Sequence, residues 1–136
     1  MFENKLVAVL NKNLEPGVAM NAIAHMTIGM GAAIGAERLR LDNYQDKNGN
    51  LYPNISQMPF IVLRAKPNEI RKAVLKAREH EIELGIFTDT MTGGTYQEQL
   101  DNTKQTAEDD IVFYGAVFFG DKNLVTEITK KFSLYK

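Results

Sequence analysis

The sequence predicts a single three-layer α/β domain spanning residues 1–136, with a mixed, mostly parallel sheet of four or more strands flanked by helices. Short apolar runs alternate along the chain with longer segments whose apolar residues recur at helical spacing. The resulting order is strand, helix, hairpin, strand, helix, strand, helix and strand, which is typical of a sheet covered by helices. No repeat or linker divides the 136 residues, so we expect one domain.

The chain opens with a strand and a long apolar helix. The run KLVAVL at residues 5–10 is continuous and apolar, as in a strand buried on both faces. Pro16 suits the first turn of a helix, and the predicted helix runs from there to about Gly31 or Gly35. Because this helix is apolar nearly all round, we expect neighbouring elements to cover most of its sides.

Residues 38–58 predict a hairpin that leads into the second clear strand. RLRLDNY alternates as a strand does, and LYPNI is a candidate for the returning arm. Between them, Asn48-Gly49 favours a two-residue type I′ turn. FIVLRA at residues 60–65 is apolar and short, which indicates a buried strand.

The second half predicts two more helices and two more strands. Pro67 opens a helix to about His80 whose apolar residues recur at i, i+3, i+4 and i+7. ELGIFTD is the third strand, and Thr95 with Glu98 forms a capping box that starts a third helix reaching Thr106. DIVFYGAVFFG is the fourth strand, and KNLVTEITKKF is either a last short helix or an extended ending.

Composition narrows the class of protein. Sixteen basic and seventeen acidic residues give a net charge of −1, which argues against a dedicated nucleic-acid binder. Basic pairs such as Lys130 and Lys131 are expected on solvated helix faces. The chain has no cysteine and no signal-peptide pattern at its start, so we expect a cytoplasmic protein. The apolar stretch 17–36 is long enough to span a membrane, but Asn21 and His25 interrupt it, and we predict no membrane span.

The sequence predicts no cofactor and no metal. Gly29, Gly31 and Gly35 have the spacing GxGxxxG at the end of a helix, whereas a dinucleotide fingerprint needs GxGxxG in the turn after a strand. These glycines therefore indicate close helix packing and helix termination. No group of His, Asp and Glu residues has the spacing of metal ligands.

Two polar residues, Asn21 and His25, stand on one face of the first helix, one turn apart. Histidine accepts and returns a proton near neutral pH, and an asparagine can orient a water or a carbonyl oxygen. Two interpretations stay open: an internal pair satisfied by backbone groups, or the floor of a cleft.

The loop DTMTGG at residues 89–94 follows a strand and precedes a capped helix, where open α/β sheets place functional loops. Asp89 can orient a base or a water, Thr88 and Thr92 can donate hydrogen bonds, and Gly93 lies where free N–H groups can meet an anion. The alternative is a flexible connection that ends in a capping threonine.

Several short motifs resemble a known family. KLVAVLNKNL, then Gly17, then NAIAH is similar to the opening of the type II peptidyl-tRNA hydrolases, and Gly17 and His25 keep the family spacing of eight. FTDTMTGGT resembles a later strand and loop of that family, with Asp89 in the position of its aspartate, and YGAVFFG resembles its last strand. The sequence resembles still more closely an uncharacterised group, the domain-of-unknown-function family two thousand, which is similar in fold to the hydrolases. The resemblance implies a peptidyl-tRNA hydrolase II-like fold.

The departures from the hydrolases concern charge. At the positions where the hydrolases carry Arg and Asp, this sequence has Asn11 and Asn13. Where the hydrolases carry Lys, it has Val18. The helix glutamine is absent, and Asn21 falls one place earlier. Loss of cationic groups removes phosphate attraction, so the resemblance together with the net charge predicts against tRNA binding.

Three functions remain open. The first is a small ester or amide hydrolase with His25 as general base, Asn21 orienting the water and Asp89 in support, which requires His25 and Asp89 to share one cleft. Its substrate-binding residues would be Asn11, Asn13, Thr88, Thr92 and Gly93. The second is a non-catalytic module for an unidentified small-molecule ligand or a protein, and the apolar first helix also suggests a homodimer. The third is a true peptidyl-tRNA hydrolase.

Overall fold

A computed structural model describes residues 2–136. Its elements are β1 (Asn4–Asn11), α1 (Pro16–Ile34), β2 (Leu41–Gln45), β3 (Leu51–Ser56), β4 (Phe60–Ala65), α2 (Pro67–Glu79), β5 (Glu83–Thr88), α3 (Tyr96–Gln105), β6 (Phe113–Asp121), α4 (Lys122–Thr129) and β7 (Ser133–Leu134). Single 3₁₀ turns lie at Asp89–Met91 and Glu108–Asp110. The expected starts of α1 and α2 at prolines, and the capping box at Thr95 and Glu98, are confirmed.

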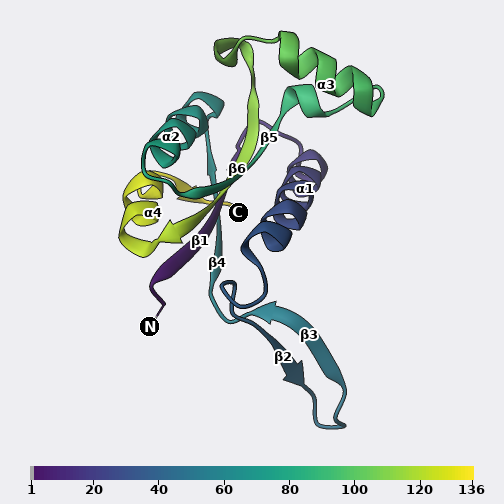
Figure 1. Ribbon diagram of the computed structural model, residues 1–136, viewed down its shortest axis with the longest axis vertical. Coiled ribbons are helices and arrows are strands. Elements are labelled where there is room, and N and C mark those ends of the chain that lie inside the picture. Colours follow the sequence, from purple (N-terminus) through teal and green to yellow (C-terminus); the bar gives the residue numbers. More distant parts are fainter. Residues whose placement is uncertain (1) are drawn as a thin grey trace.

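Five strands form one mixed sheet in the order β5–β6–β1–β4–β7 (Figure 1). Only β1 and β4 pair in parallel among these neighbours, and the other three pairs are antiparallel. The mixed sheet is confirmed, but the expectation of mostly parallel pairing was wrong. The reason is that β6 enters between β1 and β5 in the opposite direction. The open alternative for the last segment resolves into both forms, a short helix followed by a short edge strand.

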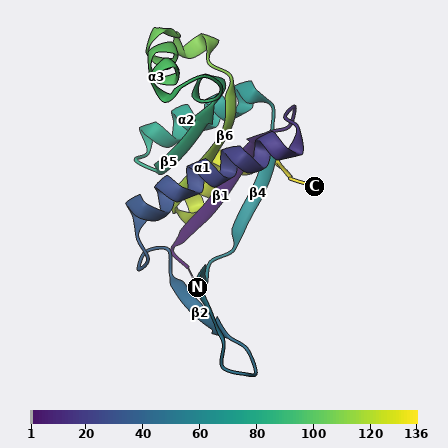
Figure 2. The same cartoon turned by 90° about the vertical axis from the view of Figure 1, so that its right-hand side faces the viewer.

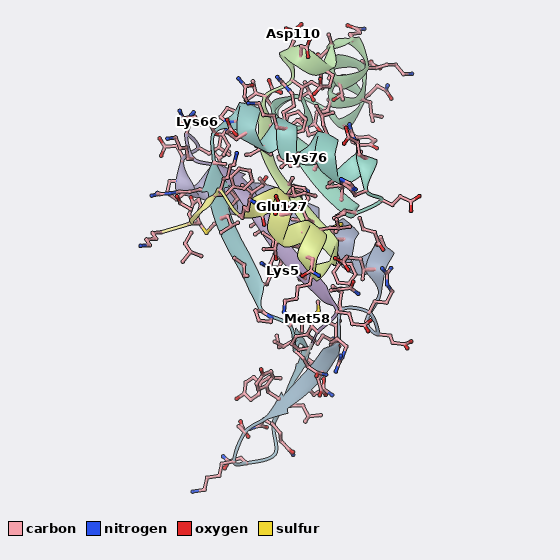
Figure 3. All side chains as sticks on the ribbon, turned by 90° about the vertical axis from the view of Figure 1, so that its left-hand side faces the viewer. Lys5, Met58, Lys66, Lys76, Asp110 and Glu127 are labelled. Carbon is pink, nitrogen blue, oxygen red and sulfur yellow. The ribbon has the colours of Figure 1, made fainter. Side chains whose placement is uncertain are left out.

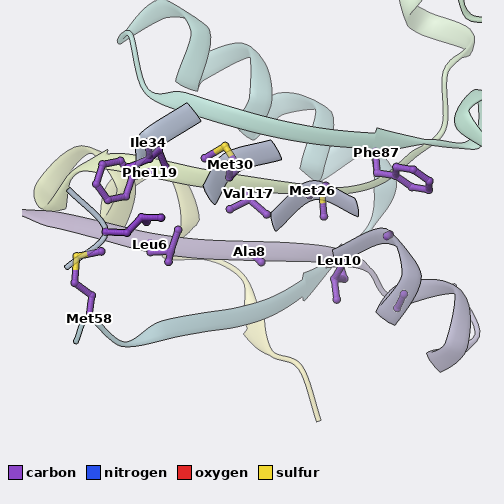
Figure 4. Close-up of a cluster of buried hydrophobic side chains, with 13 residues drawn as sticks. Leu6, Ala8, Leu10, Met26, Met30, Ile34, Met58, Phe87, Val117 and Phe119 are labelled. Carbon is purple, nitrogen blue, oxygen red and sulfur yellow. The ribbon is translucent and has the colours of Figure 1, made fainter. Parts of the chain in front are cut away.

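Both faces of the sheet are covered, which makes three layers. Neighbouring residues of β6 show this, because Phe118 and Phe119 point to opposite faces and each is 0% exposed. Phe119 belongs to the cluster under α1, whose members include Met26 and Met30 (Figure 4). Phe118 belongs to the cluster under α2 and α4.

The predicted burial of α1 was wrong. One stripe of the helix faces the sheet, and its buried residues are Ala19, Ala22, Met26, Met30 and Ile34. The outer side is open, with Ile28 74% and Met20 65% exposed. Figure 2 shows α1 lying across this face as its outermost described element.

Strands β2 and β3 form a separate hairpin, here called the arm, which projects from the body (Figures 1 and 2). The predicted two-residue type I′ turn was wrong: the strands are joined through residues 46–50, and Gly49 but not Asn48 has a positive φ. The Asp46 carboxylate organises this turn instead. Hydrogen bonds from the side chains of Asn50 and Tyr52 hold the pKa of Asp46 below its ordinary value.

Candidate anion-binding site

The polar pair on α1 lies at the surface. Asn21 and His25 are both exposed, so the interpretation as an internal hydrogen-bonded pair was wrong. The His25 imidazole stacks on the Phe87 ring, with centroids 5.2 Å apart and planes 8° apart. Phe87 lies in β5, two residues before Asp89. His25 is therefore an oriented, solvent-accessible side chain beside the carboxyl end of β5.

The side chains at the end of β5 serve mainly to hold the following loop. Asp89 Oδ1 accepts a hydrogen bond from Val112 N at 3.1 Å, and Asp89 N donates to Val112 O at 3.0 Å. Thr88 is buried, and its hydroxyl lies 2.8 Å from that of Thr90, which in turn lies 2.8 Å from that of Thr103. These contacts tie the loop at residues 89–94 to Val112, the residue before β6, and to α3.

The two asparagines at the end of β1, Asn11 within the strand and Asn13 beyond it, differ in their surroundings. Asn11 is 3% exposed, its Nδ2 donates to Phe113 O at 3.1 Å, and its Oδ1 accepts from Asn13 N at 2.9 Å. The Asn11 amide therefore ties the end of β1 to the start of β6. Asn13 itself is exposed.

Thr92 and Gly93 line a polar cavity of about 430 Å³ between the loop and α3. Glu98 and Asp101 line it as well, so its walls carry negative charge. Neither His25 nor Asn21 is among its lining residues. The structure therefore brings Thr92 and Gly93 together and leaves the α1 pair outside this cavity.

A larger cavity lies at the carboxyl ends of β1 and β4. It has a volume of about 670 Å³, and we call it the basic crevice; its lining residues are Lys12, Arg64, Ala65, Lys66, Glu69, Lys131, Phe132 and Ser133. Lys12 directly follows β1, Arg64 and Lys66 flank the end of β4, and Lys131 precedes β7. A volume of this size falls within the range of pockets for small molecules, about 300–1,000 Å³.

The topology of the sheet creates the basic crevice. Strands β1 and β4 are parallel neighbours, and Lys12 N donates a hydrogen bond to Ala65 O at 3.0 Å where both strands end. From this point β1 leads to α1 on one face of the sheet, while β4 leads to α2 on the other. A gap between strands whose connections diverge in this way is where open α/β sheets bind ligands.

The charge of the basic crevice is strongly positive. Its four cationic side chains, Lys12, Arg64, Lys66 and Lys131, take part in none of the ion pairs formed among residues 2–136. One carboxylate lines the crevice, that of Glu69, and its Oε1 lies 3.7 Å from the Nζ of Lys72. Helix α2 also begins here, at the N-cap residue Lys66 (Figure 3), whose side chain makes no capping hydrogen bond to the described part of the helix. The positive end of the helix dipole therefore adds to the field of the cations.

None of the residues that line the basic crevice was among the candidate site residues predicted from the sequence. Basic residues directly after β1 and around the end of β4 could have indicated this crevice. Residues at the carboxyl ends of strands in open α/β sheets often face a ligand. Lys131 could not be placed without β7, which the sequence left open. Among the described residues, no group of three or more His, Asp or Glu side chains is arranged to hold a metal ion.

These features define an α/β domain with a mixed five-stranded sheet and a basic crevice between its two parallel neighbouring strands. The chain belongs to the family described as protein of unknown function (DUF2000), whose model matches residues 4–136. It is similar in structure to the protein of unknown function Atu0240 from Agrobacterium tumefaciens strain C58, with a TM-score of 0.86, 23% identity and full coverage of both chains. No curated protein sequence matches the chain.

Proposed function

We propose that this domain binds a small molecule that carries a phosphate or a similar dianionic group, and that the ligand occupies the basic crevice. The observation that supports this function is the set of four cations without ion-pair partners among residues 2–136, gathered around one cavity. Gathering like charges is unfavourable unless a counter-charge offsets it. A bound dianion supplies that counter-charge.

The lining residues suit such a ligand. The Arg64 guanidinium can hold two oxygens of one phosphate, while Lys12 and Lys66 act as point charges. Phe132 offers an apolar wall for the organic part of the ligand, and Glu69 and Ser133 can accept or donate hydrogen bonds to its hydroxyl groups. Because the whole chain carries a net charge of −1, the positive field is local and favours a small ligand over a long polyanion.

Binding of pyrophosphate and of a nucleoside monophosphate, measured by titration calorimetry, tests this function. The double variant Lys12→Glu/Lys66→Glu replaces two attractions with two repulsions, so we expect its affinity to fall by about 100-fold or more. The control Lys47→Glu/Lys104→Glu makes the same change of net charge at two exposed lysines, one in the turn of the arm and one in α3, and should retain the affinity of the unmodified chain. We also expect binding to weaken as salt concentration rises.

Two results would contradict ligand binding at the basic crevice. One is the absence of binding of either anion to the unmodified chain. The other is equal binding by the unmodified chain and by the Lys12→Glu/Lys66→Glu variant, with the fold of that variant verified by circular dichroism.

Hydrolysis of an ester or amide bond is a second candidate function. It is favoured by the exposure of His25 and by its stacking on Phe87, which orients an imidazole that solvent and substrate can reach. In this candidate His25 removes a proton from the attacking water, Asn21 orients that water, and Asp89 supports the substrate from the end of β5. Peptidyl-tRNA ranks last among its substrates, because Val18 stands where the similar hydrolases carry lysine.

The test of hydrolysis is turnover of N-blocked aminoacyl-tRNA and of a small N-acyl amino acid ester. Loss of a general base lowers such a rate about 100-fold or more, so His25→Ala should abolish most of the turnover. His80→Ala is the matched control, because His80 is an exposed histidine at the end of α2. Background turnover in the unmodified chain, or equal loss in both variants, would remove this candidate.

A further inference from the structure

We propose that a second copy of this chain covers the outer side of α1, so that the domain forms a symmetric dimer. The proposed interface consists of the outer side of α1, the groove beside it and the arm. It shares no residue with the basic crevice, and it is independent of the function proposed there.

Helix α1 is unusual for an outer layer because it has no Lys, Arg, Asp or Glu in 19 residues. Surface helices of globular proteins normally carry charged residues on the side opposite the core. Here the exposed residues of α1 include Met20, Ala24 and Ile28, and the polar ones beside them, Asn21 and His25, are not Lys, Arg, Asp or Glu. An apolar outer side of this kind marks an interaction surface.

The sheet is covered unequally, which leaves a groove beside α1. Two helices, α2 and α4, pack on one face, whereas among residues 2–136 the only helix on the other face is α1, over β5, β6 and β1. On this second face an apolar groove of about 540 Å³ lies between α1, β4 and the base of the arm. Thr27 and Gly31 form its α1 wall, Phe60 belongs to β4, and Leu41 and Ile55 belong to the arm. Met58 closes the groove where the arm meets the body (Figure 3).

The arm adds exposed aromatic residues to the same region. Tyr44 and Tyr52 are cross-strand partners, 62% and 53% exposed, on a hairpin that projects from the body. Beyond its base, where Leu41 packs against the cluster under α1, the arm is a two-stranded hairpin, and such a hairpin on its own is marginally stable in water. Tyrosine and methionine are also enriched at the cores of protein interfaces.

The exposed apolar area matches what a dimer requires. Six large residues on α1, β4 and the arm are 39–74% exposed: Met20, Ile28, Tyr44, Tyr52, Ile55 and Phe60. Together they present roughly 700 Å², and a stable interface buries about 800 Å² on each partner. A surface that meets its own copy across a two-fold axis must not set like charges against each other. Helix α1 has no Lys, Arg, Asp or Glu, and the arm carries charges of both signs, Asp42 and Asp46 with Lys47.

A lipid surface suits α1 less well than a second copy does. Helices that lie on membranes carry Lys and Arg on their polar side, and α1 carries neither. By length and composition α1 is the one helix among residues 2–136 that could cross a membrane. Its buried stripe, however, is the cover of β5 and β6, and insertion into a bilayer would strip the sheet of that cover.

The test is the mass in solution, measured by sedimentation equilibrium at protein concentrations up to about 100 μM. The unmodified chain is expected at twice its chain mass of 15.3 kDa. The variant Ile28→Glu places two like charges across the two-fold axis and should be a folded monomer with the circular dichroism spectrum of the unmodified chain, because Ile28 is 74% exposed. The control Leu75→Glu changes an exposed leucine of α2, on the opposite face, and should remain a dimer.

Three results would overturn the proposal: a monomeric unmodified chain, a dimer that persists in Ile28→Glu, or a monomeric chain that co-sediments with uncharged phosphatidylcholine vesicles. The last would mean that α1 meets lipid and not a second copy. Binding of pyrophosphate to Ile28→Glu should equal that of the unmodified chain, since the basic crevice lies elsewhere.

Discussion

Replacing Phe119 by alanine is expected to lower the free energy of unfolding by about 3–5 kcal/mol. Phe119 is 0% exposed and packs among side chains of α1 and β1 (Figure 4), so truncation leaves a cavity that its neighbours cannot fill. Urea unfolding followed by circular dichroism measures the change. A loss this large is a substantial part of the total stability of a domain of this size.

Replacing Phe118 by alanine tests the packing on the other face of the sheet. Phe118 is the adjacent residue of β6 and is also 0% exposed, but it faces the cluster under α2 and α4. Because both faces of the sheet are covered, the two variants should be destabilised to similar extents. Tyr96→Ala is the control, since Tyr96 is 74% exposed and its removal should cost about 0.5 kcal/mol or less. A small effect for either phenylalanine would contradict the three-layer arrangement.

Replacing Gly115 by valine is expected to destabilise the domain by about 3 kcal/mol. A Cβ atom at Gly115 would lie 2.9 Å from Met26 Cε and 3.0 Å from both Leu10 Cδ2 and Val9 O. The methionine can move, but the backbone oxygen of Val9 belongs to β1 and cannot move without disturbing the sheet. The variant must therefore shift α1 or separate β6 from β1.

Replacing Gly29 by alanine is expected to have the opposite effect and to stabilise the domain. Gly29 lies inside α1, and apart from its chain neighbours and the backbone of α1 itself, a Cβ atom there would meet no atom of residues 2–136 within 4 Å. Alanine favours the helix over glycine by up to about 1 kcal/mol, so this variant should be more stable than the unmodified chain. Thermal unfolding of both variants measures these changes in stability: the melting temperature should fall for Gly115→Val and rise for Gly29→Ala. A Gly115→Val variant as stable as the unmodified chain would contradict the close packing of α1 on β6.

The sequence predicted the elements with local signals. Pro16 and Pro67 begin helices because a missing N–H is harmless there, and Thr95 with Glu98 satisfies the first free N–H groups of α3. The position of β6 between β1 and β5 carried no such signal. Val7 pairs with Phe118, which lies more than 100 residues later in the chain. Such a pairing depends on which arrangement of all the strands is most stable, and no local sequence pattern specifies it.

The candidate site was harder to predict for two physical reasons. The apolar sequence of α1 favours its burial, but it does not indicate whether the same chain or another molecule buries it. In the structure the same chain leaves Met20 and Ile28 exposed. The basic crevice joins residues from three separate segments, and Lys131 reaches it only because β7 pairs with β4. Thr92 and Gly93, predicted from the loop after β5, line a different, acidic cavity, and Thr88 and Asp89 are not among its lining residues.

The most direct test of the central claim is a map of amide chemical shifts during titration with pyrophosphate. Ligand binding in the basic crevice predicts that the perturbed amides cluster at Lys12, at residues 64–70 and at residues 131–133. Perturbations confined to the loop at residues 89–94 or to the surroundings of His25, or shifts scattered over all surface lysines, would contradict it.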